Sequence, residues 1–355
     1  MGIFWMNLIV VYVSSFFARY FSNPIEDLPF VKVNKFFVFL SLLSLVLVAG
    51  LQKNIGDTPF YMLSYTLIED SNLMNIKFEG DFGFNLYQSI LHRISDDPQL
   101  LIFTTALITN MLIVYILSKY SRKLELSLYV YITLGMYTVS MNGIRQYLAA
   151  ALIFTSTKYI LNGDWKKFIA IILLASTVHQ SALILIPIYF IVRREAWTKI
   201  SIGLLFLSVL IAMGFNQFSA VLFSAIEGTQ YSNYQNFSEG GANILRVAVT
   251  AVPLVIAYLG RERLRELWPK SDYIVNLTLL GFIFMVISTQ NWIFARFNIY
   301  FGLYSLILIS WILELFVKNN RKFVYFGLIL FYFIYFYFEQ VVALRIDYRS
   351  DYLNW

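Results

Sequence analysis

Two short polar clusters interrupt apolar stretches in the middle of the chain. Their six side chains carry amide, guanidinium, imidazole and hydroxyl groups, and they are Asn142, Arg145, Gln146, His179, Gln180 and Ser181. Ionisable groups inside membrane-type segments are costly and usually serve a partner or a substrate. We therefore interpret Arg145 as an anion-binding residue and His179 as a candidate base. We expect the two clusters to form half of an active site.

Both residues also have plainer interpretations. Arg145 could anchor a helix end to lipid headgroups, and His179 could simply hydrogen-bond to a neighbouring helix. The chemical interpretation is favoured because each residue stands beside further hydrogen-bonding side chains, which makes the helix face too polar for lipid. Arginine also keeps its charge at any relevant pH and binds phosphate through two parallel hydrogen bonds.

Acidic candidates lie in the stretch 53–97. Asp57 precedes Thr58 and Pro59, a pattern typical of a helix N-cap, and Tyr61 follows one turn later. A capping carboxylate can still face a cavity, so both roles stay open for Asp57.

A second acidic pattern is Glu79-Gly80-Asp81. An acid-x-acid pair can hold a divalent metal near a phosphate, although a solvated loop is the simpler interpretation. We count Glu79 among the substrate-binding candidates. We expect no metal site and no cofactor, because arginines can themselves stabilise a phosphate charge.

Further cations stand at the starts of later apolar runs. Arg296 follows Asn291 closely, and Arg246 lies just inside an earlier run. Together with Arg145 they would place three arginines at the outer ends of different helices. A pyrophosphate at the membrane surface is the anion that fits such a set best, and a lipid-linked sugar diphosphate would present one at headgroup level.

Sugar transfer from a lipid-linked diphosphate needs two kinds of group. The acceptor hydroxyl must be aligned and deprotonated, for which His179, Asp57 and Glu79 are candidates. The leaving diphosphate must be stabilised as its charge grows, for which Arg145 and Arg296 are candidates. The predicted substrate-binding residues are Asn142, Gln146, Gln180, Ser181, Tyr61, Glu79, Arg246 and Asn291.

The composition indicates which elements position these groups. Of the 355 residues, 59% are hydrophobic and 14% are charged, whereas soluble domains carry about 25% charged residues. The sequence predicts an all-α polytopic membrane protein that forms one domain over residues 1–355. The chain has 0 cysteines and 2 histidines, which excludes thiolate and histidine-rich metal centres. The net charge is +6, but the positively charged residues lie in short loops between apolar runs, so we expect no nucleic-acid partner.

Apolar runs predict about twelve transmembrane helices. The runs cover residues 2–18, 36–52, 98–118, 124–141, 144–161, 166–179, 181–192, 198–214, 243–260, 273–290, 293–317 and 322–339. The sixth and seventh are short and predict a helical hairpin that turns at residues 179–181. Such a break is tolerated at membrane depth only where it lines a cavity.

Lysine and arginine predict the orientation. Most of the 27 basic residues fall in one set of alternate loops, which the positive-inside rule assigns to the cytoplasm. Both termini and the loops 53–97 and 215–242 then face outward. Aromatic and apolar residues recur through loop 53–97 and predict two amphipathic helices at the membrane surface. Loop 215–242 is rich in Gly, Ser, Asn, Gln and Tyr, which suits either sugar contact or a disordered outer loop.

A set of short motifs points to a known family. They are Gly56-Asp57-Thr58 with Tyr61, Phe78-Glu79 with Phe82, Ile144-Arg145-Gln146 with Leu148-Ala149, Lys167-Phe168, Leu174-Ala175, and His179-Gln180-Ser181-Ala182-Leu183 with Pro187. Over residues 40–300 the chain resembles the EpsG family, whose members are Wzy-type polymerases of bacterial surface polysaccharides. Arg296 fits a later arginine of the family. One departure is Gly80, where family members often have proline.

The resemblance implies a GT-C-like architecture and an enzyme of the bacterial inner membrane whose active site faces outward. It implies transfer of the growing glycan from undecaprenyl diphosphate onto the non-reducing end of a new lipid-linked repeat unit. No nucleotide sugar would be needed. The implied partners are the undecaprenyl-diphosphate-linked oligosaccharide, membrane lipid, and a flippase and a chain-length regulator of the same pathway.

Three other functions compete with polymerisation. An O-antigen-type ligase would use nearly the same chemistry, and only the resemblance favours the polymerase over it. A lipid-linked oligosaccharide flippase should carry charges deep in many spans, whereas the polar residues here crowd on one side. A membrane acyltransferase would also use a membrane histidine, but its acyl donor would lie on the inner side.

Overall fold

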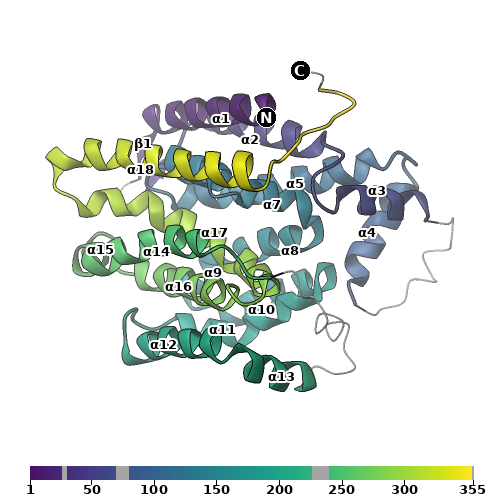
Figure 1. Ribbon diagram of the computed structural model, residues 1–355. Helices are drawn as coiled ribbons and strands as arrows, with labels where there is room; N and C mark the ends of the chain where they lie inside the picture. The colour runs from purple at the N-terminus through teal and green to yellow at the C-terminus, as the bar shows by residue number, and fades with distance from the viewer. Residues whose placement is uncertain (26–29, 69–79, 226–239, 354–355) are drawn as a thin grey trace. The chain divides into compact units, whose positions relative to one another are not determined.

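The computed structural model describes residues 1–25, 30–68, 80–225 and 240–353 (Figure 1). Within these ranges the secondary structure is almost entirely helical, which confirms the all-α class. The described strands, β1 (Asn23–Pro24) and β2 (Val31–Lys32), form a short antiparallel pair.

Internal contacts divide the chain into two compact units. Unit 1 comprises Met1–Tyr189 with Ile309–Trp355, and unit 2 comprises Phe190–Leu308. The interpretation of residues 1–355 as one membrane domain remains a prediction.

Unit 1 contains the helices from the first half of the chain and the last helix. They are α1 (Gly2–Tyr20), α2 (Lys35–Gly50), α3 (Thr58–Thr66), α4 (Phe82–His92), α5 (Gln99–Tyr120), α6 (Leu124–Thr133), α7 (Met136–Asn142), α8 (Ile144–Phe154), α9 (Thr157–Asn162), α10 (Trp165–Val178), the 3-10 turn η2 (Gln180–Ile184), the 3-10 turns η5 (Leu313–Leu315) and η6 (Lys318–Asn320), α18 (Arg321–Phe336) and the π-helix η7 (Tyr337–Ala343). Inside this unit α1 packs on α2 and α6, α5 on α2 and α8, and α10 on α8 and α4.

Unit 2 contains the later helices. They are α12 (Lys199–Met213), α13 (Phe215–Ala225), α14 (Ile244–Leu259), α15 (Arg261–Leu267), α16 (Ser271–Ile287) and the 3-10 turn η4 (Trp292–Phe294). In sequence, α11 (Leu185–Val192) and α17 (Ala295–Ile312) each begin in one unit and end in the other. Within unit 2, α16 packs against α12 and α14.

Four described helical segments are long and apolar enough to cross a membrane: Gly2–Tyr20, Gln99–Tyr120, Trp292–Leu315 and Lys318–Ala343. The number rises to six if each of two bent pairs is one span, namely Lys199–Met213 with Phe215–Val221 and Ile244–Leu259 with Arg261–Leu267. The chain is therefore a membrane protein by the length and apolar character of its helices. The count of about twelve crossings and the GT-C-like architecture remain predictions.

The twelve predicted apolar runs fall on helical segments, but three regions are interrupted. Run 124–141 is divided between α6 and α7, run 144–161 between α8 and α9, and region 166–192 at His179. A straight crossing of the bilayer core requires about 20 helical residues. The interruptions therefore leave helices that are too short to cross alone.

Helices α3 and α4 lie within the predicted outer loop 53–97. Helix α3 buries Tyr61 and Tyr65 on one face and exposes Phe60 and Leu63 on another. A helix with an outward apolar face suits the membrane surface, and that location remains a prediction. In loop 215–242, α13 occupies the first part, whereas residues 226–239 lie outside the described ranges.

Candidate active site

The carboxylate of Asp81 is the centre of a polar cluster in unit 1. Its Oδ2 atom lies 2.9 Å from Nδ1 of His179 and 3.2 Å from a terminal nitrogen of Arg145. Its Oδ1 atom accepts a hydrogen bond of 2.8 Å from the backbone N–H of Gln180. The side chain of Asp81 is 8% exposed, that of His179 is 19% exposed and that of Arg145 is 36% exposed. A buried acid thus holds two partners that extend toward the surface.

His179 is positioned by a break in its helix. Helix α10 ends at Val178, His179 has an extended backbone with φ −151° and ψ 112°, and η2 begins at Gln180. The start of any helical turn leaves N–H groups without intrahelical partners, and Asp81 accepts one of them. The break agrees with the interruption predicted at residues 179–181.

Arg145 lies in the first turn of α8, where its guanidinium has aromatic neighbours. Its Nε atom donates a hydrogen bond of 3.4 Å to the hydroxyl of Tyr61. Its Cζ atom lies 5.5 Å from the ring centroid of Tyr61 and 5.9 Å from that of Phe84, within the range of cation–π attraction. These contacts orient the guanidinium while leaving part of it accessible to a ligand.

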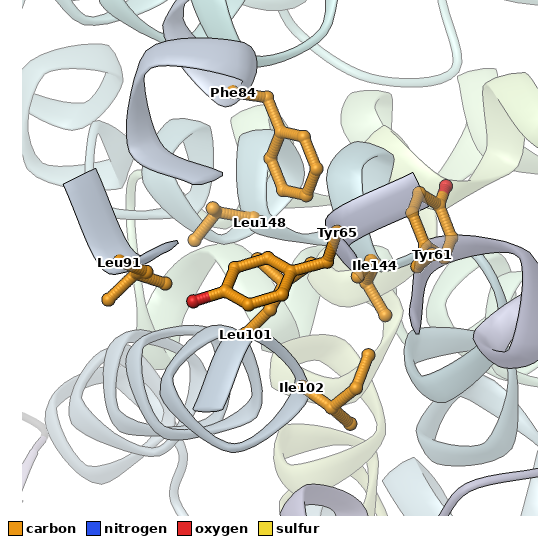
Figure 2. Packing of buried hydrophobic residues seen from close by; sticks show 8 residues of the cluster. All are labelled: Tyr61, Tyr65, Phe84, Leu91, Leu101, Ile102, Ile144 and Leu148. Carbon is orange, nitrogen blue, oxygen red and sulfur yellow. The ribbon is translucent and has the colours of Figure 1, made fainter. Parts of the chain in front are cut away.

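An apolar cluster fixes the helices that carry these groups. Figure 2 shows its eight side chains, which come from α3, α4, α5 and α8: Tyr61, Tyr65, Phe84, Leu91, Leu101, Ile102, Ile144 and Leu148. The rings of Tyr61 and Phe84 meet edge to face, with centroids 6.2 Å apart. Each large apolar side chain that is fully buried stabilises the folded state by roughly 1.5–3 kcal/mol. Tyr61 therefore belongs both to this cluster and to the polar site.

Two glycines allow Asp81 to reach His179. A Cβ atom at Gly83 of α4 would lie 2.3 Å from Oγ1 and 2.9 Å from the backbone oxygen of Thr177 in α10, so these helices approach closely because Gly83 has no side chain. Gly80 has φ +59°, in the left-handed region that glycine favours. Proline is fixed near φ −65°, so proline at position 80 would not allow this backbone conformation.

Two predicted site residues, Asp57 and Asn142, connect α3 to the break between α7 and α8. The backbone N–H of Asp57 donates a hydrogen bond of 2.8 Å to Oδ1 of Asn142. Asp57 occupies the N-cap position of α3, as predicted, but its side chain makes no capping hydrogen bond and is exposed. Asn142 therefore has a structural role, and direct substrate contact by either residue remains a proposal.

The other predicted residues of unit 1 differ in exposure. Gln146 is 7% exposed, so it lies on a buried face of α8. Gln180 is exposed and contributes its backbone N–H to Asp81, and Ser181 is partly buried in η2. Glu79 lies outside the described residues, and its role stays a prediction.

Three predicted residues belong to unit 2. Arg246 lies in the first turn of α14. Asn291 caps η4 by accepting a hydrogen bond of 3.0 Å from the N–H of Ile293, and the guanidinium of Arg296 lies 4.8 Å from the ring of Trp292. Their participation in the site of unit 1 remains a prediction.

The electrostatic balance keeps Asp81 ionised. Burial raises the pKa of its carboxyl, but the hydrogen bond and charge of His179, the N–H of Gln180 and the charge of Arg145 outweigh burial and lower the pKa below the ordinary value of 3.8. An ionised carboxylate only accepts hydrogen bonds, so the proton of a neutral His179 lies on Nδ1 and its lone pair on Nε2.

The cluster can perform two tasks. Nε2 of His179 can take a proton from a hydroxyl, and the accessible guanidinium of Arg145 can bind an anion. Within the described ranges, no group of three His, Asp or Glu side chains could hold a metal ion. Among the described residues the acid that contacts His179 is Asp81, which stands in the Glu79-Gly80-Asp81 pattern but was not among the predicted site residues; Glu79 was predicted to bind substrate and lies outside the described residues. The signal available in the sequence was the acid-x-acid pattern, which does not say which acid faces the histidine.

Comparison with known proteins identifies one family. The model of the EpsG family matches residues 35–350 of the chain. No curated protein and no solved structure matches the chain.

Proposed function

The chain belongs to the EpsG family, and on this premise we propose that it is a polymerase of bacterial surface polysaccharide. It would transfer a growing glycan from undecaprenyl diphosphate to the non-reducing end of a new lipid-linked repeat unit, on the outer face of the inner membrane. Family membership and the apolar helices make it a membrane protein related to polysaccharide biosynthesis. The specific reaction, substrate and orientation are the proposal.

The observation that carries the proposal is the cluster of Asp81, His179 and Arg145. It combines a hydrogen-bonded imidazole with the guanidinium of Arg145, whose side chain is 36% exposed. Glycosyl transfer from a diphosphate needs a base for the acceptor and a cation for the leaving group. The cluster supplies one of each.

The proposed reaction divides the work between these residues. Nε2 of His179 takes the proton of the acceptor hydroxyl, and the hydroxyl oxygen forms a bond to the anomeric carbon of the donor. The bond between that carbon and the phosphate oxygen breaks, and its electron pair leaves on undecaprenyl diphosphate. Arg145 stabilises the charge that develops there, and Arg296 is a second candidate for the same task.

The surroundings of the cluster suit a substrate with a long apolar tail. Helix α3, which supplies Tyr61 to the site, exposes Phe60 at 64% and Leu63 at 58%, and its C-cap residue Leu67 is 70% exposed. Apolar side chains exposed at a membrane surface are stable against lipid chains. An isoprenoid tail would lie against the same kind of surface while its diphosphate reached Arg145.

The test is polymerisation with purified components. The protein in nanodiscs is given lipid-linked repeat units from its host, with chelator and without nucleotide sugar, and the products are separated on a gel. A ladder of lengthening chains is expected. The His179→Gln variant should slow ladder formation severely, whereas His92→Gln, which changes the chain's other histidine, should leave the rate unchanged.

Three other outcomes would point elsewhere. A ladder that requires added divalent metal would contradict the arginine-based mechanism and direct attention to the acids of residues 79–81. A single transfer to a different acceptor, without a ladder, would identify a ligase. Donor binding without any transfer, together with movement of the lipid between leaflets, would identify a flippase.

A further inference from the structure

The carboxylate of Asp81 contacts both His179 and Arg145. We propose that Asp81 is a positioning residue for His179, which holds the imidazole proton on Nδ1 so that Nε2 faces the acceptor hydroxyl as the base. The inference rests on the proposed glycosyl transfer and adds a residue to its machinery. The contact joins residues 98 positions apart in sequence, at a distance of 2.9 Å.

The carboxylate is held in one orientation. Oδ1 accepts the backbone N–H of Gln180 at 2.8 Å, and Oδ2 lies against Nδ1 of His179. Gln180 directly follows His179. One carboxylate therefore binds the imidazole ring of His179 and the backbone N–H of the next residue, both at the break between α10 and η2. Rotation of the carboxylate would break both contacts, and therefore the imidazole plane is fixed as well.

Burial separates this role from that of Arg145. The side chain of Asp81 is 8% exposed and cannot easily contact a sugar, whereas the ring of His179 is 19% exposed. The charged and titratable groups that the described helices bring against the pair are Arg145 of α8 and, hydrogen-bonded to it, Tyr61 of α3. Arg145 forms an ion pair with the same Oδ2 atom, so Asp81 links the base to the proposed diphosphate-binding residue.

The chemistry follows from the fixed tautomer. With Nδ1–H donated to Asp81, the lone pair of the neutral ring is on Nε2. When Nε2 takes the acceptor proton, the ring becomes a cation whose charge lies beside an ionised carboxylate. Asparagine at position 81 would keep the shape of the side chain but could donate its amide N–H to Nδ1. That bond would move the ring proton to Nε2, which could then no longer act as a base.

A purely structural role is the alternative. Asp81 stands at the N-cap position of α4 without a capping hydrogen bond, and its contacts could serve only to hold α4 against α10. In that case its loss should lower stability and all kinetic constants together. A positioning role instead lowers kcat selectively and changes which ring nitrogen of His179 carries the proton.

The chain offers a matched control. Its other histidine, His92, lies 3.8 Å from Asp96, whose side chain is 94% exposed. Asp96→Asn removes the same charge from the second Asp–His pair, outside the proposed site. It should leave polymerisation unchanged.

The first experiment measures initial polymerisation rates against donor concentration. In Asp81→Asn we expect kcat to fall roughly 100-fold or more, with KM for the donor little changed. Asp81→Glu should restore part of kcat. The double variant Asp81→Asn with His179→Gln should be no slower than His179→Gln alone.

The second experiment reads the tautomer without activity. With 2 histidines in the chain, the ¹⁵N ring signals of the protein in bilayers can be assigned by comparison with His92→Gln. The expected result is a neutral His179 protonated on Nδ1 in the wild type and on Nε2 in Asp81→Asn. If Asp81→Asn does not fold, the wild-type spectrum alone decides.

The outcomes separate the two proposals. A wild-type ring protonated on Nε2, or an Asp81→Asn variant with unchanged kcat, would overturn the role of Asp81 while leaving a polymerase. A wild-type protein that makes no ladder would overturn the proposed reaction. In that event, protonation on Nδ1 would still establish that Asp81 positions the histidine.

Discussion

At the scale of single residues, the site depends on how one guanidinium is oriented. Arg145 is held by the carboxylate of Asp81 on one side and by the hydroxyl of Tyr61 on the other. Its side chain is 36% exposed, and a guanidinium can bind a diphosphate through two parallel hydrogen bonds.

We predict that Arg145→Ala reduces chain growth by roughly 100-fold or more, because a preorganised donor to the leaving group is lost. Arg145→Lys should recover only part of the rate, since a single ammonium cannot make the paired contact. The measurement is the initial rate of ladder formation. Arg263→Ala is the control, because Arg263 is a half-exposed residue of unit 2 that pairs with Glu266. Full activity in Arg145→Ala would remove the residue from the site.

At the scale of helices, the close approach of α4 and α10 places Asp81 beside His179. Gly83 lies opposite Thr177, and a Cβ at Gly83 would meet a backbone oxygen at 2.9 Å, which cannot rotate away as a side chain could. The geometry of the contact between Asp81 and His179 therefore depends on a residue that is itself outside the cluster.

Gly83→Ala should separate the helices and lower activity by roughly 100-fold, since misplacement by about 1 Å has effects of that size. It should also lower the thermal midpoint of the protein in detergent. Gly327→Ala in α18 is the matched control, because a Cβ there meets nothing within 4 Å and alanine favours a helix. If Gly83→Ala and Gly327→Ala behave alike, the close approach has no importance for the site.

At the scale of the whole molecule, the remaining question is which side of the membrane the site faces. The positive-inside rule predicts that residues 53–97 lie outside and that the loop around residues 261–270 lies in the cytoplasm. The absence of cysteine allows a direct test, because the chain has 0 cysteines to remove first.

Single cysteines at exposed positions should report the orientation. Asp96→Cys replaces a side chain that is 94% exposed, and Glu262→Cys replaces one that is 85% exposed. A membrane-impermeant maleimide should label Asp96→Cys in intact cells and Glu262→Cys only after permeabilisation. The reverse pattern would place the site of unit 1 on the cytoplasmic side and contradict an outward-facing polymerase.

Several features could be predicted from the sequence because they depend on local properties. The membrane class follows from long apolar runs, and these runs predict the positions of the helices. Arg145 and His179 stand out because charged or titratable groups are costly in such segments. The break at His179 was also visible, since a polar cluster there divides two short apolar runs.

Other features were decided by the tertiary structure alone. Asp81 and Glu79 are separated by one residue in the sequence, and the contact of Asp81 with His179 depends on the close approach of α4 to α10 at Gly83 and Thr177. Likewise, the exposed carboxylate of Asp57 does not cap its helix, and the Asn142 side chain binds the backbone there instead. Apolar patterning determines which segments become helices, whereas the partner of a polar side chain depends on loop geometry and helix packing between residues far apart in the sequence.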